Sequence, residues 1–173
     1  MFEKFCNHAA MMVLGIFVGA IVAAAWMGVG QGTHVHASAT HGESNFAIAT
    51  GSADNGIEAF YFLDFLTGDL RAAVISRRTA EFTAVFERNI QADFGAISKN
   101  PKYLMVTGLA DLPRGRASTQ IGTSLVYVAE ATSGVVCAYA LPFNSSLNAA
   151  GKTQRAELEL IATGTFRTTA VRE

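Results

Sequence analysis

Residues 58–76 read EAFYFLDFLTGDLRAAVIS, two apolar runs that are separated by Thr67-Gly68. Phe, Tyr, Val and Ile favour the pleated strand, and a glycine in a short polar break adopts the positive φ that reverses the chain. The segment therefore predicts a β-hairpin. In its first strand both alternating sets of side chains are mostly apolar, whereas a sheet with one wet side alternates apolar with polar residues. We therefore expect this strand to be covered by a layer on each side.

The same pattern returns at residues 124–141, SLVYVAEATSGVVCAYAL. A shift of 66 positions aligns Asp64 with Glu130 and Gly68 with Gly134. The second half also carries a polar insertion that is typical of a loop, residues 144–154. Flanking runs complete each half as outer strands: residues 46–50 and 81–86, then residues 103–107 and 156–158.

This internal similarity predicts an all-β fold in which two four-stranded antiparallel repeats follow an N-terminal hydrophobic helix. The β module would span residues 46–173, with repeat one at residues 46–98 and repeat two at residues 103–173. The two sheets could pack face to face as a small sandwich. Alternatively, they could be propeller-like blades that depend on neighbouring copies of the chain, and both arrangements stay open.

Each hairpin contains a strand that ends in an acidic residue, a Thr-Gly or Ser-Gly turn and an outgoing apolar strand. The residues are 61–64 with Thr67-Gly68, and 127–130 with Ser133-Gly134. This pattern resembles the β-propeller-blade repeats of the pyrroloquinoline-quinone type over most of residues 46–173, which implies blade-like sheets. A closed propeller needs about four or more blades, and this chain has two units and no blade-locking tryptophan. No cofactor residues carry over, so we expect no cofactor.

Residues 9–30, AAMMVLGIFVGAIVAAAWMGVG, carry no charged side chain. As a helix they would be about 33 Å long, enough to span a hydrocarbon core of about 30 Å. We therefore expect residues 1–30 to be a signal-anchor helix or a signal peptide, with the membrane as a partner through residues 9–30. Lys4 and the positively charged amino terminus precede this segment, which predicts that the following residues lie outside the cytoplasm.

The anchor and the signal peptide remain alternatives. The uncharged run is longer than the apolar core of a signal peptide, which favours a single-pass protein of the cytoplasmic membrane with an extracytoplasmic C-terminal domain. However, Val35-His36-Ala37 suits signal peptidase, and cleavage near Ala37 would give a secreted or periplasmic protein. Gly15 and Gly19 share a helix face at a spacing that lets membrane helices associate into a homo-oligomer, but glycine and alanine are also common in membrane helices and signal sequences that do not associate.

Residues 31–45, QGTHVHASATHGESN, are small and polar, which predicts a flexible linker. Three histidines lie in it, His34, His36 and His41, and alternating imidazoles can bind Zn²⁺ or Cu²⁺. A flexible linker has no surrounding residues that would orient such ligands. We therefore predict solvated histidines and no metal.

The overall composition excludes some classes of function. With a formal net charge of −1, a pI near 6.4 and scattered basic residues, the chain gives no reason to expect nucleic acid. Cys6 and Cys137 do not make a disulfide framework, and Cys137 is expected to be free and buried in a strand. Residues 46–173 contain no His and no other Cys, so the commonest bases, nucleophiles and metal ligands are missing.

Two groups of side chains remain as candidate sites. Asp64 and Glu130 could form an acid–base pair across the two repeats, with Asp69 and Asp111 as further candidates. Acidic residues before a turn more often cap it by accepting backbone hydrogen bonds. Loop arginines could bind a phosphate or a carboxylate, because a guanidinium binds oxyanions through two bonds, or they could be simply solvated. These arginines are Arg114 and Arg116 in one loop and Arg77 and Arg78 in another.

The sequence leaves two functions open. The missing nucleophiles and the membrane segment favour a membrane-targeted extracytoplasmic interaction or structural module that has no catalytic activity and can self-assemble. The alternative is a carboxylate-dependent extracytoplasmic enzyme. The sequence identifies neither a substrate nor a protein partner.

Overall fold

The structure, a computed structural model, describes residues 40–95, 101–110, 112 and 120–167. Within these ranges the chain forms mainly strands, with two short helices. Their bounds are β1 (Thr40–Gly42), β2 (Phe46–Asp54), β3 (Ile57–Asp64), β4 (Asp69–Ile75), β5 (Phe82–Asn89), η1 (Gln91–Phe94), β6 (Tyr103–Leu109), β7 (Ser124–Glu130), β8 (Val135–Ala140), α2 (Ser145–Ala149), β9 (Gln154–Glu157) and β10 (Glu159–Thr165).

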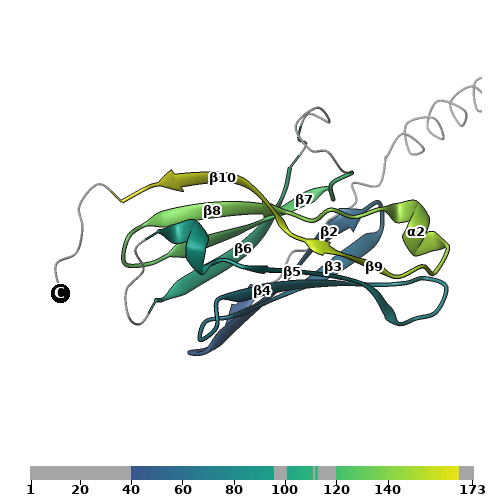
Figure 1. The fold of residues 1–173 in the computed structure, drawn as a ribbon, viewed down its shortest axis with the longest axis horizontal. Coiled ribbons are helices and arrows are strands. Elements are labelled where there is room, and N and C mark those ends of the chain that lie inside the picture. Colours follow the sequence, from purple (N-terminus) through teal and green to yellow (C-terminus); the bar gives the residue numbers. More distant parts are fainter. Residues whose placement is uncertain (1–39, 96–100, 111, 113–119, 168–173) are drawn as a thin grey trace, which may run out of the picture. The chain divides into compact units, whose positions relative to one another are not determined.

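The strands form two sheets that lie one above the other (Figure 1). The larger sheet has six strands in the order β1-β2-β3-β4-β5-β9, and the smaller has four in the order β10-β8-β7-β6. Neighbouring strands are antiparallel except β5 and β9, which are parallel. The predicted all-β fold with two sheets is confirmed. The prediction of four strands in each sheet is wrong for the larger one, because β1 and β9 extend a four-strand meander at its two edges. The run predicted as the fourth strand of the second repeat, residues 156–158, lies mainly in β9 of the larger sheet, and β10 is the fourth strand of the smaller sheet.

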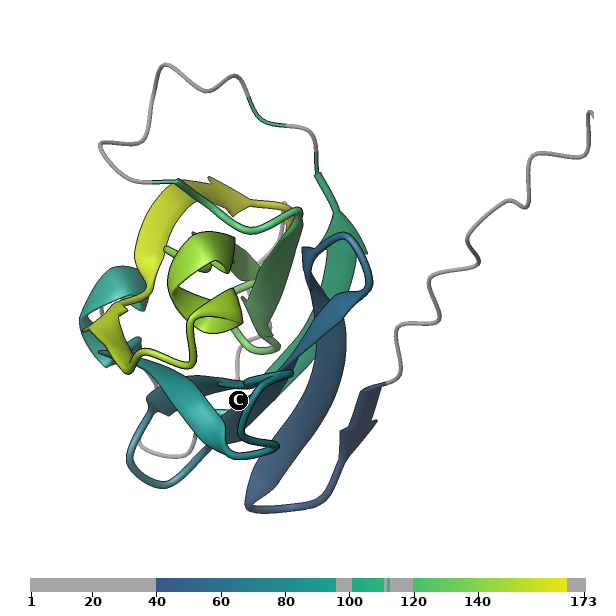
Figure 2. The same ribbon diagram turned by 90° about the vertical axis from the view of Figure 1, so that its right-hand side faces the viewer.

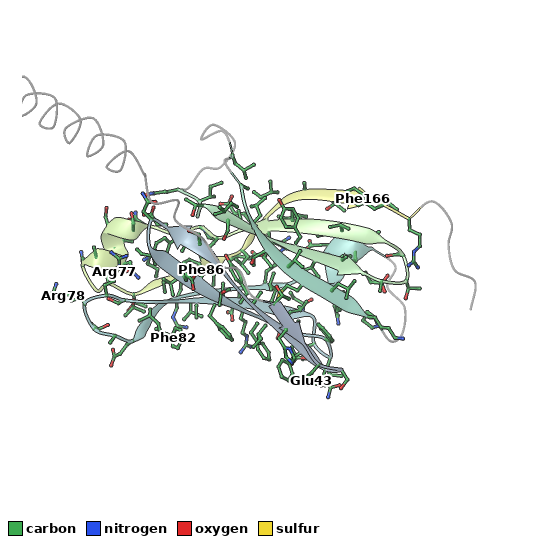
Figure 3. All side chains as sticks on the ribbon, turned by 180° about the vertical axis from the view of Figure 1, so that it is seen from behind. Glu43, Arg77, Arg78, Phe82, Phe86 and Phe166 are labelled. Atoms are coloured by element: carbon green, nitrogen blue, oxygen red, sulfur yellow. The ribbon has the colours of Figure 1, made fainter. Side chains whose placement is uncertain are left out.

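One hydrophobic core fills the space between the sheets. The larger sheet contributes Tyr61 and Leu63 of β3 and Phe86 of β5, each at most 1% exposed. The smaller sheet contributes Val128 of β7 and Tyr139 of β8, which are fully buried. Figure 3 shows Phe86 in the interior between the two layers. Buried residues alternate along β3 and β4 with more exposed ones, so the pleat of the strand decides which side chains enter the core.

The four-strand meander of the larger sheet and the smaller sheet have equivalent register. Tyr61 of β3 lies opposite Ala72 of β4, and 66 positions later Tyr127 of β7 lies opposite Ala138 of β8. The pairing of β4 with β5 also corresponds to the pairing of β8 with β10, when the additional residues that include α2 are left out of the alignment. There the matching pairs are Leu70 with Arg88 and Val136 with Gly164.

The two sheets are joined along both sides. On one side, β9 and β10 are successive parts of one extended stretch that crosses from the larger sheet to the smaller at Leu158. Leu158 is fully buried, and its N–H donates to the carbonyl of Glu87 at 3.3 Å. On the other side, the hydroxyl of Ser124 in β7 donates to the carbonyl of Ser52 in β2 at 2.7 Å. Both joins hold the layers in register around the core.

The insertion that was predicted as a loop contains the helix α2. The side chain of Asn144 caps this helix by accepting the N–H groups of Ser146 and Leu147 at 3.0 and 3.1 Å. Asn148 is fully buried, and the hydroxyl of Ser76 donates to its carbonyl at 3.3 Å. These contacts fix α2 at the end of the two layers that faces the viewer in Figure 2.

Among the residues that the structure describes, no further layer covers the outer face of the larger sheet, so β3 is not covered on both sides as predicted. Tyr61 on the inward set is fully buried, but Phe60 on the outward set is 39% exposed. Phe62 stacks on Phe46 of the neighbouring strand, with 5.4 Å between the ring centroids. Outward apolar side chains therefore shield one another across strands.

Part of the predicted linker, residues 31–45, forms β1, in which His41 lies opposite Ile48. The predicted membrane segment, residues 9–30, lies outside the described residues, as do His34, His36 and the cleavage position at Ala37. In the part of the chain that the structure describes, neither helix has the length and apolar character needed to cross a membrane.

Candidate functional site

The carboxylate of Asp64 belongs to the turn between β3 and β4. Its Oδ1 accepts the N–H of Leu66 at 2.8 Å and the N–H of Thr67 at 3.4 Å. Its main-chain carbonyl accepts the N–H of Gly68 at 2.9 Å. Gly68 has a φ of 72°, a conformation that costs glycine little and other residues more. Asp64 therefore holds the shape of the turn.

Glu130 makes the equivalent arrangement in the turn between β7 and β8. Its Oε1 accepts the N–H of Thr132 at 3.1 Å, and its Oε2 accepts the N–H of Ser133 at 2.6 Å. Burial of Glu130 favours its neutral form, but the bonds from Ser133 and Thr132 outweigh this and hold its pKa below the ordinary value of 4.5. The interpretation of Asp64 and Glu130 as turn-capping residues is confirmed.

The other candidate carboxylates do not join them. Oδ1 of Asp69 accepts a hydrogen bond from Nδ2 of Asn89 at 2.9 Å, and its Oδ2 lies 3.8 Å from Nη2 of Arg71. Asp111 lies outside the described residues. Of the three candidates that the structure describes, only Asp69 lines the hollow discussed below.

Arg77 and Arg78 lie beside α2, at one end of the two layers (Figure 3). Nη2 of Arg77 donates to the carbonyl of Gly56, and Nη1 of Arg78 donates to the carbonyl of Ala150 at 3.3 Å. Each guanidinium group therefore connects the segment after β4 to another loop through a hydrogen bond. The other two candidate arginines lie outside the described residues, so a binding site there stays a prediction: Arg114 and Arg116.

A partly buried ionic cluster surrounds Arg88 at the end of β5. Nε and Nη2 of Arg88 donate to the two carboxylate oxygens of Asp93 in η1, both at 2.8 Å. Its Nη1 donates to Oε1 of Glu157 in β9 at 2.7 Å. The hydroxyl of Tyr139 in β8 adds a bond of 3.1 Å to Oδ2 of Asp93. The cluster therefore connects β5, η1, β8 and β9 where the chain crosses between the sheets.

Contacts within this cluster shift the pKa values of Asp93, Arg88 and Tyr139. The hydrogen bonds from Arg88 lower the pKa of Asp93 against the opposing effect of burial. The hydrogen bond from Asp93 raises the pKa of Arg88. Burial, with the nearby Cys137 and Asp93, raises the pKa of Tyr139 far above its ordinary value, so its hydroxyl stays a donor. The arrangement keeps Asp93 as an acceptor and Tyr139 as a donor, and it supports the fold where the chain crosses between the sheets.

Sequence reasoning missed this cluster, although one signal for it exists. Ala84, Phe86 and Arg88 occupy alternate positions of one strand, and the first two point into the core. The alternation therefore places a charged residue at an inward position, where it needs a partner. Its partners Asp93 and Glu157 could not be chosen from the sequence, because Glu157 lies 69 positions away.

An open hollow of about 660 Å³ lies along β5 and β9. Its lining carries charges of both signs and one side-chain amide, contributed by Asp69, Glu87, Arg88, Asn89, Arg155 and Glu157. In the described part of the chain, no group of three or more His, Cys, Asp or Glu side chains is placed to hold a metal ion. The hollow thus offers scattered polar contacts without a concentrated charge.

Cys137 is free and fully buried in β8, which confirms the prediction for this residue. Its thiol lies 3.7 Å from the carbonyl of Asp93 and 3.6 Å from the hydroxyl of Thr163. Cys6 lies outside the described residues. A thiol enclosed in this way is a small core side chain.

No protein-family model, characterised protein or solved structure matches the chain. The candidate site must therefore be judged by its geometry. The candidate carboxylates and arginines that the structure describes bond to the module's own turns, loops and strands, while large apolar side chains point outward from both sheets. The outward faces of the sheets are the surfaces most suited to contact another molecule.

Proposed function

We propose that the chain is a non-catalytic interaction module that residues 9–30 hold at the cytoplasmic membrane, with residues 40–167 displayed outside the cytoplasm. The uncharged run and the positive charges before it support this attachment and orientation. Cleavage near Ala37 would release the same module as a secreted or periplasmic protein. Equivalent register supports a module built from two copies of one four-strand unit, packed as a small sandwich and similar to propeller blades.

The observation that carries the interaction role is the apolar character of the outward-facing side chains. On the larger sheet Phe60 and Phe82 are 39% and 57% exposed, and on the smaller sheet Leu104 and Val106 are 65% and 54% exposed. Figure 3 shows Phe82 on the outer side of the larger sheet. Isolated exposed apolar residues are normal, but apolar residues gathered on one face mark interaction surfaces.

Photo-crosslinking in cells that make the full chain tests this proposal. A photoreactive amino acid in place of Phe60 should give a macromolecular adduct of reproducible mass, because Phe60 points out from the larger sheet. The same amino acid in place of Asn55, an exposed residue of the β2–β3 turn, is the matched control and should give little adduct. Protease added outside spheroplasts should digest the module.

Two results would contradict the proposal. One is a module that external protease cannot reach until the membrane is broken. The other is a folded Asp64→Asn variant that has lost the cellular role of the protein, because that would give the carboxylate a chemical task beyond the turn. Enzyme chemistry would then become the better interpretation.

A further inference from the structure

The outer face of the smaller sheet is apolar across all four strands, and Ala110, Leu112 and Ile121 pack on one end of it, over Leu125, Ala138 and Ala140. One cross-strand row consists of Leu104, Ala129, Val136 and Gly164. The next row consists of Val106, Tyr127, Ala138 and Ala162. These eight positions contain no charged residue, and we call them the small-sheet face. Phe166 continues it beyond β10, because its ring lies 3.1 Å from the position that a Cβ on Gly164 would occupy.

The open part of the small-sheet face carries its most exposed apolar side chains at the edges of the sheet. Leu104 and Val106 stand on the edge strand β6, and Phe166, which is 79% exposed, stands at the end of the opposite edge strand β10. Figure 3 shows Phe166 on the outer side of this sheet. Between these edges, the row of Leu104 contains Ala129 and Val136, whereas in the next row Tyr127 is half-buried and Ala138 is only 7% exposed. A second copy can therefore pack its exposed edge side chains on the row of Leu104.

Charges occur at two opposite corners of the small-sheet face. Lys102 precedes β6, and the alternation of the strand places it on the side of Leu104. Glu159 begins β10 opposite Ala140, at the other end of the strands and at the other edge of the sheet. A two-fold axis can lie in the plane of the interface, pass through the centre of the face and run perpendicular to the line that joins these corners. Rotation about this axis brings the Lys102 corner of one copy onto the Glu159 corner of the other. Each Lys102 then lies over Glu159 of the other copy.

We propose that the small-sheet face binds the same face of a second copy of this chain, giving a two-fold symmetric dimer. This inference rests on the proposed function as an interaction module and names the surface and the partner. The apolar rows bury one another, and the corners form two reciprocal Lys102–Glu159 ion pairs. The strands of the two facing sheets cross steeply, as in orthogonal sheet packing. Two-fold pairing through a self-complementary patch is the commonest way in which soluble chains assemble.

The larger sheet fits this role less well. Its outward row beside Phe62 contains Arg71, Glu87 and Glu157, so a facing copy would have to bury charges of both signs. A lipid surface also fits the small-sheet face less well. Glu159 lies at its corner, and binding to anionic lipids depends on several clustered basic residues.

The first experiment measures the mass of the full chain in detergent solution or nanodiscs by native mass spectrometry and sedimentation. The expected result is twice the mass of one chain. Leu104→Asp places a charge in the apolar row and should weaken the dimer by at least about tenfold. Leu66→Asp is the matched control, because Leu66 is 75% exposed in the β3–β4 turn and lies off this face. Circular dichroism shows that both variants are folded.

The second experiment tests the symmetry. On a Cys6→Ser background, Lys102→Cys and Glu159→Cys chains are treated with a short thiol-specific crosslinker, alone and mixed. A crosslinked dimer should form in the mixture and not with either variant alone, because the axis brings residue 102 of one copy to residue 159 of the other. Gly19→Leu on the same background shows whether crosslinking is independent of the predicted membrane helix.

A full chain that stays monomeric, a dimer that survives Leu104→Asp, or a mixture that crosslinks no better than each variant alone would overturn the dimer. Lipid adducts from a photoreactive group at residue 104, without dimer, would assign the face to the membrane instead. The proposed function fails separately. If the chain is monomeric but Phe60 still crosslinks to another protein, the interaction module stands and only this inference falls.

Discussion

Asp64 and Glu130 occupy equivalent turns but use their oxygens differently. Asp64 accepts both turn N–H groups with Oδ1, whereas Glu130 accepts one N–H with Oε1 and the other with Oε2. An amide has only one acceptor oxygen, since its other end is an NH₂ donor. The two turns therefore respond differently to a change that removes the charge and keeps the shape.

Glu130→Gln should cost about 1–3 kcal/mol of unfolding free energy, because one partly buried turn N–H then faces an amide donor in place of a charged oxygen. Asp64→Asn should change this free energy by less than about 0.5 kcal/mol, because the amide oxygen can replace Oδ1. Urea unfolding of residues 36–173, the compact unit that contains both sheets, measures both values through the tyrosine circular dichroism. Equal costs for the two variants would show that the second carboxylate oxygen of Glu130 makes no separate contribution.

These residues also show what a sequence reveals at the scale of single side chains. The capping role of Asp64 could be predicted because its partners lie two and three positions away. The role of Arg88 could not, because one of its partners, Glu157, comes from a strand much later in the chain. The loop residues Arg77 and Arg78 had no local partner in the sequence, and in the fold they bond to the carbonyls of Gly56 and Ala150.

Among the elements, the extended stretch that contains β9 and β10 belongs to both sheets, because it adds one edge strand to each. It changes sheets at Leu158, whose side chain belongs to the common core and whose N–H bonds to β5. Side chains of a strand alternate between its faces, so a shift of one position here would exchange the inward and outward residues on one side of the crossing. The crossing therefore sets the register of both edge strands.

Leu158→Ala should lower the unfolding free energy by about 2–5 kcal/mol, the range for removing a fully buried leucine side chain. Leu160→Ala is the matched control, because Leu160 is 37% exposed on β10, and it should cost less than about 1.5 kcal/mol. Urea unfolding of residues 36–173 compares the two variants. If both cost the same, Leu158 does not act as a core anchor at the crossing.

At the scale of helices and strands, the sequence predicted those elements that residues close together in the chain determine. The hairpins β3–β4 and β7–β8 were predicted because a turn signal separates two apolar runs in each. The edge strand β1 was not, because a strand of three residues shows no pattern. The strand predicted at residues 156–158 overlaps β9, but it pairs with β5 of the larger sheet and not within the second repeat, because its partner lies far away in the sequence. The five residues of α2 are likewise too few to show a helical period. Only tertiary contacts select such short elements.

For the whole molecule, two acidic groups link folding to pH. Asp93 and Glu130 both have pKa values lowered in the folded state, so the folded protein holds their protons less tightly than the unfolded chain does. Their contribution to stability is fully present above the ordinary values of 3.8 and 4.5, and it is lost as the pH falls through the lower folded values. The protein should therefore lose stability in acid below about pH 4.5.

Urea unfolding at a series of pH values between about 3 and 7 checks this loss. In the Asp93→Asn/Glu130→Gln double variant, the unfolding free energy should be lower at neutral pH and should fall less steeply in acid. Glu58→Gln removes an exposed carboxylate and should leave the slope unchanged. If the double variant kept the full acid slope, carboxylates elsewhere in the chain would be responsible.

The crossing at Leu158 has a consequence for how the protein is made. A ribosome delivers residues in order, so the first meander can close while the second is still being synthesised. The second sheet cannot be completed until Thr165 has left the exit tunnel, because β10 is its final edge. During this interval the backbone of β8 lacks its outer neighbour and stays open to pairing with another strand.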